Sequence, residues 1–557
     1  AVGHQALTAQ TGTSGTVANT AVGYQAGLAI TKGRYSTAIG YQSLLTETVG
    51  DRSTAVGYQA LYSQIIGGGD NQISGNTGIG MDAGLFNVTG TNNTWVGYNA
   101  GQGVSTNSNS NNVGIGANAL LAVTTGGYNT VIGASAGDSM TTSTNNVVLG
   151  YNAFSAADAG QNNNIIIGSG AALSMDGSGC DDNVIIGKDA GVGGAVNVTD
   201  CIVIGSNAMN STADNAQTGT IAIGHSALTA LTSGVGNLAV GYQAMAALTS
   251  GANNIGIGYQ AGYALVEGNY NTAVGTYAFM SGQEDSKCVA IGYKALLVAD
   301  VSNTGSAVDT LNTAVGYQAG EYVSTGKYNT FMGASAGQGI TGTAITGDNN
   351  TAIGASAGLE LEGAAHSNTF VGKAAGYTTE AGVENTCIGY ACLAEDDTAT
   401  NQVVIGNNVT GTADNAVHIG NDSNHLYTAF SSDSWSATSD IRQKKNIQDD
   451  TLGLEFINSL RTTTYSHKSP SEFPKEWKSY NPDDKEPMDG DKVFHSLIAQ
   501  EVKQSLDDIG CETFDGWSVD PDGRQRVART SFVTPLIKAI QELSAEVESL
   551  KEQLKNK

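Results

Sequence analysis

The phrase Asn19-Thr-Ala-Val-Gly-Tyr-Gln-Ala-Gly27 recurs with small changes along most of this chain. Its first glycine, Gly23, has counterparts at Gly40 and Gly57, a spacing of 17 residues, and the series continues to Gly406. A fixed period near 20 residues is typical of solenoids and stacked fibres, in which each repeat forms one layer. The sequence therefore predicts that residues 1–425 form one long β-repeat shaft rather than several compact domains.

The phrase itself predicts a short strand. Thr, Val and Tyr alternate with Ala and Gly, which gives one larger face and one smaller face that a neighbouring backbone can approach closely. The Asn before the strand suits a turn and, in a stack of coils, a side-chain ladder. All 6 prolines lie after the repeats, as expected where most backbone N–H groups serve β-ladders. We expect a mainly β fold of the parallel β-helix or β-roll type.

The repeats resemble the head repeats of trimeric autotransporter adhesins, which stack as left-handed parallel β-rolls. The adhesin repeats are usually shorter than the 17-residue step found here. The resemblance implies a trimeric shaft. It leaves open the handedness of the coils, and whether each chain coils alone or three chains intertwine.

The composition changes at Ser436-Ala-Thr-Ser-Asp-Ile-Arg-Gln-Lys-Lys-Asn-Ile447, after which the chain is lysine-rich and non-repetitive. This motif and three later blocks, 454–460, 495–502 and 531–543, resemble in the same order the self-cleaving intramolecular chaperone domain of phage endosialidases and tail fibres. The resemblance implies that residues 439–557 form a small α+β chaperone domain. Residues 426–438 are then a connector, with Phe430 and Trp435 as aromatic anchors.

The same resemblance implies a cleavage reaction. In the family the bond before the motif serine is cut, which is Thr438–Ser439 here, and the base is the lysine five residues on, Lys444. A serine hydroxyl becomes a good nucleophile only when a base removes its proton. Asp440 is a candidate to orient the site or to act as an alternative base. The other interpretation is that Ser439 and Asp440 merely cap a helix.

The last segment, 531–557, predicts a helix with a coiled-coil seam. Its apolar residues alternate at steps of three and four, the a/d spacing of a heptad repeat. The residues of this a/d seam are Val533, Leu536, Ile540, Leu543, Val547, Leu550 and Leu554. Because endosialidase-type chaperones are trimers, the resemblance implies a trimeric coiled coil. The alternative is a helix packed only on its own domain.

Other motifs in the shaft predict no chemistry. Gly133-Ala-Ser-Ala-Gly137 matches a hydrolase nucleophile elbow, but it falls at the repeat position of Gly-Tyr-Gln-Ala-Gly. No glycosidase-like pair of carboxylates can be identified, and we expect self-cleavage to be the only enzymatic activity. The repeat tyrosines are either packing residues or platforms for sugars. We expect no cofactor and no metal, since no His or Cys set has metal-ligand spacing.

Charge and composition restrict the partners. A net charge of −26 argues against nucleic-acid binding, and no stretch resembles a membrane span, so membrane insertion is not expected. Residue 1 lies inside a repeat-like stretch, so we expect a fragment whose missing N-terminal region would contact other virion tail proteins.

Together these features predict a fragment of a homotrimeric phage tail fibre or tailspike. We expect it in the virion, or extracellular after release, attached to a glycan or outer-membrane component of a bacterium. A bacterial trimeric surface adhesin and a polysaccharide-degrading tailspike are the alternatives.

Overall fold

The computed structural model describes residues 1–557 except 12–15, 70–71, 105–106, 195–196, 213–215, 300–305, 423, 432–435, 438–440, 442–443, 476, 478, 488, 491 and 522. The chain divides into two compact units, Ala1–Thr438 and Ser439–Lys557. Each unit is considered by itself below.

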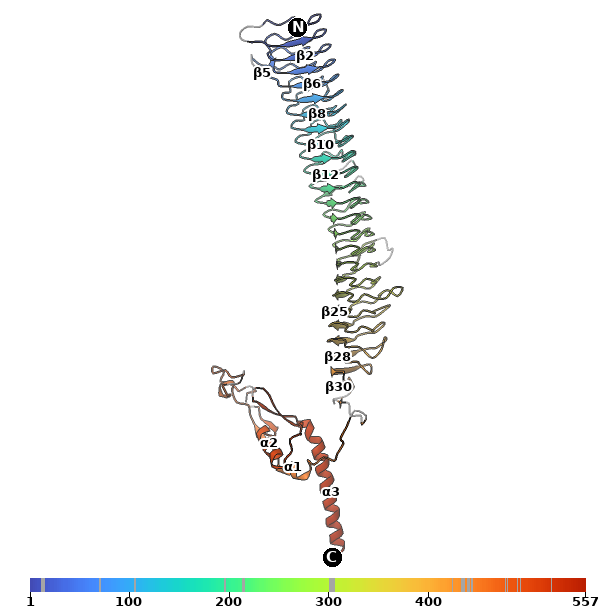
Figure 1. Cartoon of the computed structure of the whole chain (residues 1–557), viewed down its shortest axis with the longest axis vertical. Coiled ribbons are helices and arrows are strands. Elements are labelled where there is room, and N and C mark those ends of the chain that lie inside the picture. Colours follow the sequence, from blue (N-terminus) through green and yellow to red (C-terminus); the bar gives the residue numbers. More distant parts are fainter. Residues whose placement is uncertain are drawn as a thin grey trace. The chain divides into compact units, whose positions relative to one another are not determined.

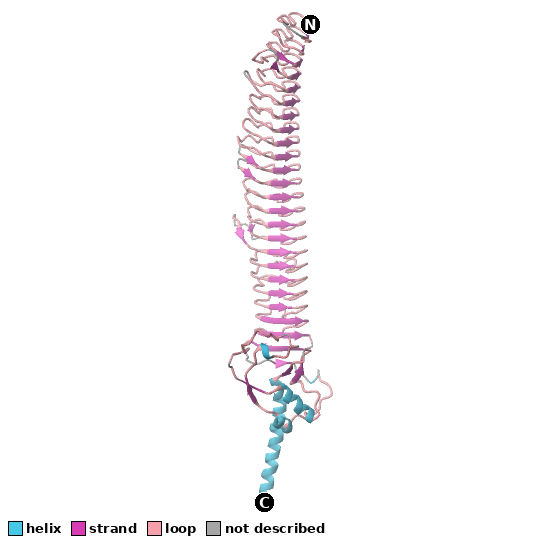
Figure 2. Cartoon of the chain, turned by 90° about the vertical axis from the view of Figure 1, so that its left-hand side faces the viewer, coloured by secondary structure: helices cyan, strands magenta, loops and turns pink. Residues whose placement is uncertain are grey.

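The first unit is a β-solenoid in which one short strand is laid down in each coil (Figure 1). Its main sheet has 25 strands, and each parallel strand pairs in register with its equivalent in the next coil, as Thr20 pairs with Thr37 and Val22 with Ile39. Figure 2 shows these strands aligned along one side of the shaft. The prediction of a mainly β repeat shaft, followed by a small domain with a C-terminal helix, is confirmed.

The parallel strands of the main sheet are β1 (Thr20–Val22), β2 (Thr37–Ile39), β4 (Thr54–Val56), β6 (Thr77–Ile79), β7 (Thr94–Val96), β8 (Val113–Ile115), β9 (Thr130–Ile132), β10 (Val147–Leu149), β11 (Ile165–Ile167), β12 (Val184–Ile186), β14 (Ile202–Ile204), β16 (Ile221–Ile223), β17 (Leu238–Val240), β18 (Ile255–Ile257), β19 (Thr272–Val274), β21 (Val289–Ile291), β23 (Thr313–Val315), β24 (Thr330–Met332), β25 (Thr351–Ile353), β26 (Thr369–Val371), β27 (Thr386–Ile388), β28 (Gln402–Asn407) and β29 (Ala416–Asn421). All of these pairings join strands of the same chain, so the backbone ladders of the described coils need no second chain.

Short side sheets and a terminal hairpin complete this unit. The side sheets pair β3 (Gly50–Asp51) with β5 (Gln72–Ile73), β13 (Val198–Thr199) with β15 (Gln217–Thr218), and β20 (Asp285–Ser286) with β22 (Val308–Asp309). At the last coil the chain reverses: β30 (Asn424–Ala429) runs antiparallel to β29, and β31 (Ser436–Ala437) runs antiparallel to β30.

The size of the residues decides which side of each strand is buried. The middle residue, Ala38 in β2, points into the coil, while Thr37 and Ile39 point outward. The turn after the strand forms a second ladder, because Gln42 N donates to Tyr24 O of the preceding coil at 2.9 Å and Leu44 N donates to Ala60 O of the next at 2.9 Å. The described coils therefore hold one another on two sides.

The glycine that follows the strand in each repeat is required because neighbouring coils approach closely there. Gly40 has φ +134°, and a Cβ built on it would lie 2.2 Å from the carbonyl oxygen of Gly57 in the next coil. Only glycine combines that φ with that contact. The predicted close approach at a small residue is therefore confirmed, and the approaching group is the backbone of the equivalent glycine.

The two successive Asn residues that precede β10 have separate roles. Asn145 takes the left-handed conformation with φ +60°, which Asn tolerates better than most residues. Asn146 is buried and belongs to a ladder: its Nδ2 donates to Asn129 Oδ1 at 3.1 Å and its backbone N donates to the same oxygen at 3.0 Å. The predicted Asn ladder thus lies inside the solenoid, where it satisfies buried backbone groups.

The second unit is a small α+β domain. Its helices are α1 (Leu454–Ser459), α2 (Ala499–Asp508) and α3 (Val533–Lys555), with 3-10 turns η2 (Pro470–Glu472) and η3 (Arg529–Phe532). Two antiparallel pairs join β32 (Thr463–Tyr465) to β33 (Phe494–Ser496), and β34 (Trp517–Val519) to β35 (Gln525–Val527). The buried core consists of Leu452, Phe456, Val502, Leu506 and Phe532.

Some local expectations change in the structure. The predicted helix 531–557 is α3, Val533–Lys555, and it is preceded by the turn η3. Phe430 was expected to anchor the connector, yet its side chain is 49% exposed. The strands β30 and β31 extend the shaft through backbone pairing, and an anchoring role for Phe430 stays a prediction. Trp435 lies outside the described residues.

Candidate functional site

The segment that carries the predicted cleavage chemistry is described only in part. Thr438, Ser439 and Asp440 lie outside the described residues. Lys444, the predicted base, and the neighbouring Lys445 are exposed, and Lys444 N donates to Ile441 O at 3.1 Å. The roles of these residues therefore stay predictions that rest on the motif.

The strand just before the predicted scissile bond belongs to the shaft. The backbone of β31 pairs with β30, with Ala437 opposite Leu426 and Ser436 opposite Tyr427. Strand β30 in turn pairs along its whole length with β29 of the last coil. The chain upstream of residue 438 is thereby fixed to the solenoid by backbone hydrogen bonds.

Downstream, contacts between α1 and α3 stabilise the C-terminal unit. Helix α1 begins at Leu454, whose backbone N donates to Glu542 Oε2 of α3 at 2.7 Å. A carboxylate at a helix N-terminus satisfies an unpaired N–H and interacts favourably with the helix dipole. Gly453 leaves room for it, because a Cβ there would lie 2.2 Å from Glu542 Oε2.

Helix α3 has two unlike faces. Pro535 and Ala539 are buried against the rest of the domain. The residues of the a/d seam lie elsewhere on the helix and are between 41% and 73% exposed: Val533, Leu536, Ile540, Leu543, Val547, Leu550 and Leu554. The alternative of a helix packed only on its own domain accounts for the first face but leaves this apolar seam in solvent.

An open hollow of about 420 Å³ lies beside β32 and β33, and the motif search did not indicate it. Thr462–Thr464, His495–Leu497 and Arg529 line it. Thr463 Oγ1 donates to Ser496 O at 2.9 Å, so this hydroxyl ties the two strands together. The lining residues come from three separate parts of the chain, which is why spacing alone could not find the hollow.

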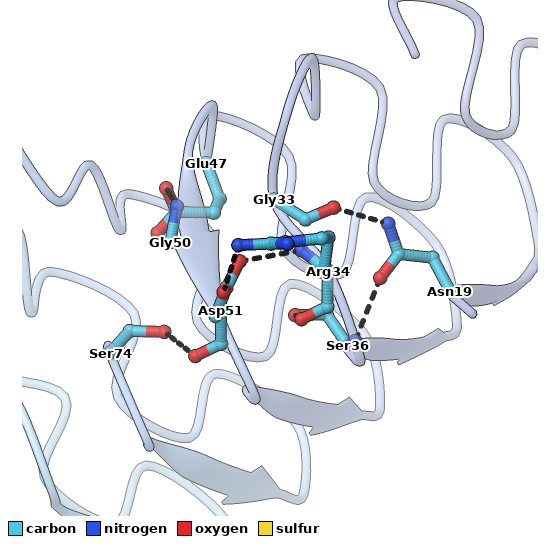
Figure 3. A network of polar contacts seen from close by, with 8 residues as sticks. All are labelled: Asn19, Gly33, Arg34, Ser36, Glu47, Gly50, Asp51 and Ser74. Atoms are coloured by element: carbon cyan, nitrogen blue, oxygen red, sulfur yellow. Dashed lines mark hydrogen bonds and ion pairs between the residues drawn. The ribbon is translucent and has the colours of Figure 1, made fainter. Parts of the chain in front are cut away.

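The buried carboxylates near the start of the shaft serve the fold (Figure 3). Glu47 Oε1 accepts the backbone N–H groups of Thr48, Val49 and Gly50 at 2.8, 3.1 and 2.7 Å. Asp51 accepts the backbone N–H of Arg34 at 2.8 Å and lies 3.4 Å from its guanidinium. Glu47 therefore stabilises its own turn, and Asp51 joins two neighbouring coils.

The stretch 133–137 matches a hydrolase nucleophile elbow in sequence but not in structure. Ser135 lies in the turn after β9 with φ +51°, and its backbone N donates to Ala117 O of the preceding coil at 2.9 Å. No helix follows it in this described coil, whereas a nucleophile elbow leads from a strand into a helix.

The repeat tyrosines form exposed columns on the shaft. The rings of Tyr24, Tyr41 and Tyr58 are stacked at centroid distances of 5.3 and 5.1 Å, and His225, Tyr242 and Tyr259 form a second column. Within a column each ring covers the face of its neighbour. Tyr24, Tyr41 and Tyr58 are 42%, 42% and 45% exposed, but a ring inside a column has no free face on which a sugar can stack.

The described residues contain neither a metal cluster nor a membrane-spanning helix. No group of three or more His, Cys, Asp or Glu is placed to hold a metal ion in this part of the chain. Among the helices that are described, none is both long and apolar enough to cross a bilayer.

Comparison with known proteins adds one result. No curated protein matches the chain, and no solved structure matches it. Residues 439–511 match the family model described as chaperone of endosialidase. The C-terminal unit therefore contains a region similar to that chaperone, and in the sequence this unit follows a β-solenoid shaft.

Proposed function

We propose that this chain is part of a homotrimeric phage tail fibre or tailspike, whose C-terminal domain assembles the shaft and is then released by autoproteolysis. The observation that carries the proposal is the match of residues 439–511 to the chaperone of endosialidase, directly after a solenoid of near-identical repeats. The shaft would attach the virion to a glycan or outer-membrane component of the host.

Trimer formation is assigned to the a/d seam of α3. An apolar heptad seam left in solvent is unfavourable, and burial between equivalent helices removes it from water. The residues after Glu542 are exposed to the end of α3, so copies of the helix can meet there without displacing its contacts to α1.

Near-identical repeats supply the physical need for a chaperone. A slip by one coil places similar side chains in similar sites, and exposed strand edges can pair with other chains. Long-range pairing is also slow. A domain that first brings three chains together at one end starts all three solenoids from the same level.

The cleavage is proposed as an attack within one chain. Lys444 takes the proton of the Ser439 hydroxyl, and Oγ attacks the carbonyl carbon of Thr438. The Thr438–Ser439 C–N bond breaks, the Ser439 amine leaves with a proton, and an ester joins Thr438 to Oγ. Water hydrolyses this ester to give the Thr438 carboxylate and restores the hydroxyl. Asp440 orients the site or replaces Lys444 as base.

Release after assembly makes the fibre kinetically stable. Folding starts at the C-terminal domain, so after its release the shaft cannot unfold by the reverse of its folding pathway. The unfolding rate is then set by the activation barrier of the shaft alone. The position of β31 suits this order, because the shaft keeps its terminal hairpin when the chain is cut after residue 438.

The test compares the full chain with a truncation that ends at residue 438. Sedimentation velocity is expected to show soluble trimers, cleaved or uncleaved, only from the full gene, and aggregates or monomers from the truncated gene. Soluble trimers in equal yield from the truncated gene would contradict a chaperone role.

A further inference from the structure

One side of the shaft is uncharged along its whole length and carries a continuous row of apolar residues. In each three-residue parallel strand the first and third residues point outward, and we call these positions, with Val403, Ile405, Val417 and Ile419 in β28 and β29, the sheet face. The third position is Val, Ile, Leu or Met in every parallel strand, and the first is Thr, Val, Ile or Leu. Figure 2 shows the strands that carry this face aligned along one side.

The composition of the sheet face differs from that of the chain. None of its residues is charged, although the chain has 25 Lys and Arg and 51 Asp and Glu. Its side chains remain in contact with solvent: Ile39, Ile257 and Ile388 are 38%, 37% and 40% exposed. With a rise of about 4.8 Å per coil, the face extends on the order of 110 Å. Apolar patches larger than a few hundred Å² mark interaction sites.

A partner that covers the whole sheet face must be as long as the face itself. It has to present an apolar surface that is just as long and has the same step along its axis, since a globular partner would cover only a few coils. Another copy of this shaft has that surface by construction. The same chain also carries the exposed a/d seam of α3, whose heptad spacing independently indicates association between copies.

We propose that the sheet face is the surface by which copies of the shaft pack against one another around the axis of the trimer. The inference rests on the proposed homotrimer and adds which side of each solenoid faces inward. It places the contacts of the mature fibre in the shaft itself, so the trimer persists after the C-terminal domain is released.

The test uses the full chain with a single added cysteine that carries a nitroxide label. Ile257→Cys places the label on the sheet face, and Val235→Cys places it in a loop outside any strand, where the native side chain is 41% exposed. Unsubstituted protein treated with the same reagent controls for the native cysteines. Sedimentation velocity gives the number of copies, and the electron paramagnetic resonance spectrum reports how close the labels lie.

In a trimer, the Ile257→Cys label is expected to be immobilised and broadened by the labels of the other copies, while the Val235→Cys label stays mobile and unbroadened. A trimer in which both labels are mobile and unbroadened would overturn the sheet-face inference but leave the homotrimer intact, with the face open to another partner. A monomer would overturn both.

Discussion

Gly101 lies directly against the indole ring of Trp95: a Cβ built on Gly101 would come within 2.2 Å of Trp95 Cδ2. Trp95 is the middle residue of β7 and is fully buried in its coil. The same ring requires glycine at Gly84 and Gly114, where a Cβ would lie 2.6 and 2.7 Å from it. The coils around β7 are therefore matched to this one ring, although most coils of the shaft are alike.

Phe331 and Gly337 repeat the arrangement farther along the shaft, with a Cβ at Gly337 2.2 Å from the ring. Where the middle residue is small, as Gly78 is in β6, the space is filled by Leu61 of the preceding coil. In these coils the phrase therefore ends in Gly where it meets a large ring, as at Gly101 and Gly337, and in Leu where it meets Gly78. Such pairs fix the register once the first coils have formed.

Gly101→Ala is expected to destabilise the coils around β7 by about 2–4 kcal/mol, because it adds overpacking to the strain of a left-handed residue. Gly219→Ala is the matched control: Gly219 has φ +63° and no atom within 4 Å of a built Cβ. It should cost only about 1 kcal/mol. Hydrogen exchange of the surrounding amides measures both, and equal effects would contradict the proposed role of the Trp95 contact.

The Asn ladder predicts a loss of similar size from removing buried hydrogen bonds. Asn129 Oδ1 accepts from Asn146 N at 3.0 Å and from Asn146 Nδ2 at 3.1 Å, all within the buried interior. Asn129→Leu leaves these donors unpaired and is expected to cost about 2–4 kcal/mol. Its neighbour Tyr128 is exposed with φ +60°, so Tyr128→Asn should be neutral or slightly stabilising. Thermal unfolding of the two variants provides the comparison.

The a/d seam of α3 predicts the effect of charge on assembly. Leu543→Asp combined with Leu550→Asp places carboxylates where three helices are proposed to meet, and should abolish the trimer or make the shaft insoluble. Gln541→Asp combined with Ser549→Asp adds the same charge to exposed positions of α3 outside the seam. Sedimentation of the control pair should match the wild type; equal loss in both pairs would point to charge rather than to the seam.

The last coil should respond to acid through His418. Its ring is buried in β29, its Nε2 accepts Thr412 N at 3.3 Å, and it lies near the rings of His425 and Tyr427. Burial, and then the charge of His425, lowers the pKa of His418. A lowered pKa means that the unfolded chain binds the proton first, so stability is full above about pH 6.5 and falls as the pH drops through the lowered pKa.

The control for this pH effect is His418→Val, since Val404 occupies the same register position in β28. When the pH is lowered from 7.5 to 5, hydrogen exchange of β29 and β30 should become faster in the wild type, after correction for the intrinsic exchange rate. The increase should be smaller in the variant. The same acceleration in both proteins would exclude His418 as the cause.

The sequence contained most of the fold but not all of it. The spacing of Gly23, Gly40 and Gly57 was sufficient to predict the stacked coils and the short strand in each of them. The reason is that each coil needs glycine, in the same backbone conformation, at this position. Periodicity could not indicate which chain supplies the next layer, since a neighbouring coil and a neighbouring chain present the same phrase. The pairing of Trp95 with Gly101 also escaped notice, because it depends on which side chains meet inside a coil.

The candidate site was less accessible to prediction than the fold. The heptad of α3 could be predicted directly from the sequence. The division of the helix into a buried face at Ala539 and an exposed seam could not, because it depends on how α1 packs against the helix. The hollow beside His495 joins three distant segments and has no local signature. For the cleavage motif, the relation of Lys444 to Ser439 rests on spacing and on the family resemblance alone.

The cleavage chemistry also predicts how the two neighbouring lysines differ. Lys444→Ala removes the proposed base and should leave the chain uncut, whereas Lys445→Ala should slow cleavage at most. Asp440→Ala tests the alternative base. Intact mass after a fixed time measures each variant, and full cleavage of Lys444→Ala with loss in Asp440→Ala would transfer the role of base to Asp440.

The intact mass of purified Ser439→Ala protein, measured beside the wild type, tests the central claim most directly. Wild-type protein is expected to give two fragments, the smaller beginning at Ser439, and Ser439→Ala to give an uncut chain that still sediments as a trimer. Processing of Ser439→Ala at the same bond and rate would contradict autoproteolysis and assign the cut to an external protease.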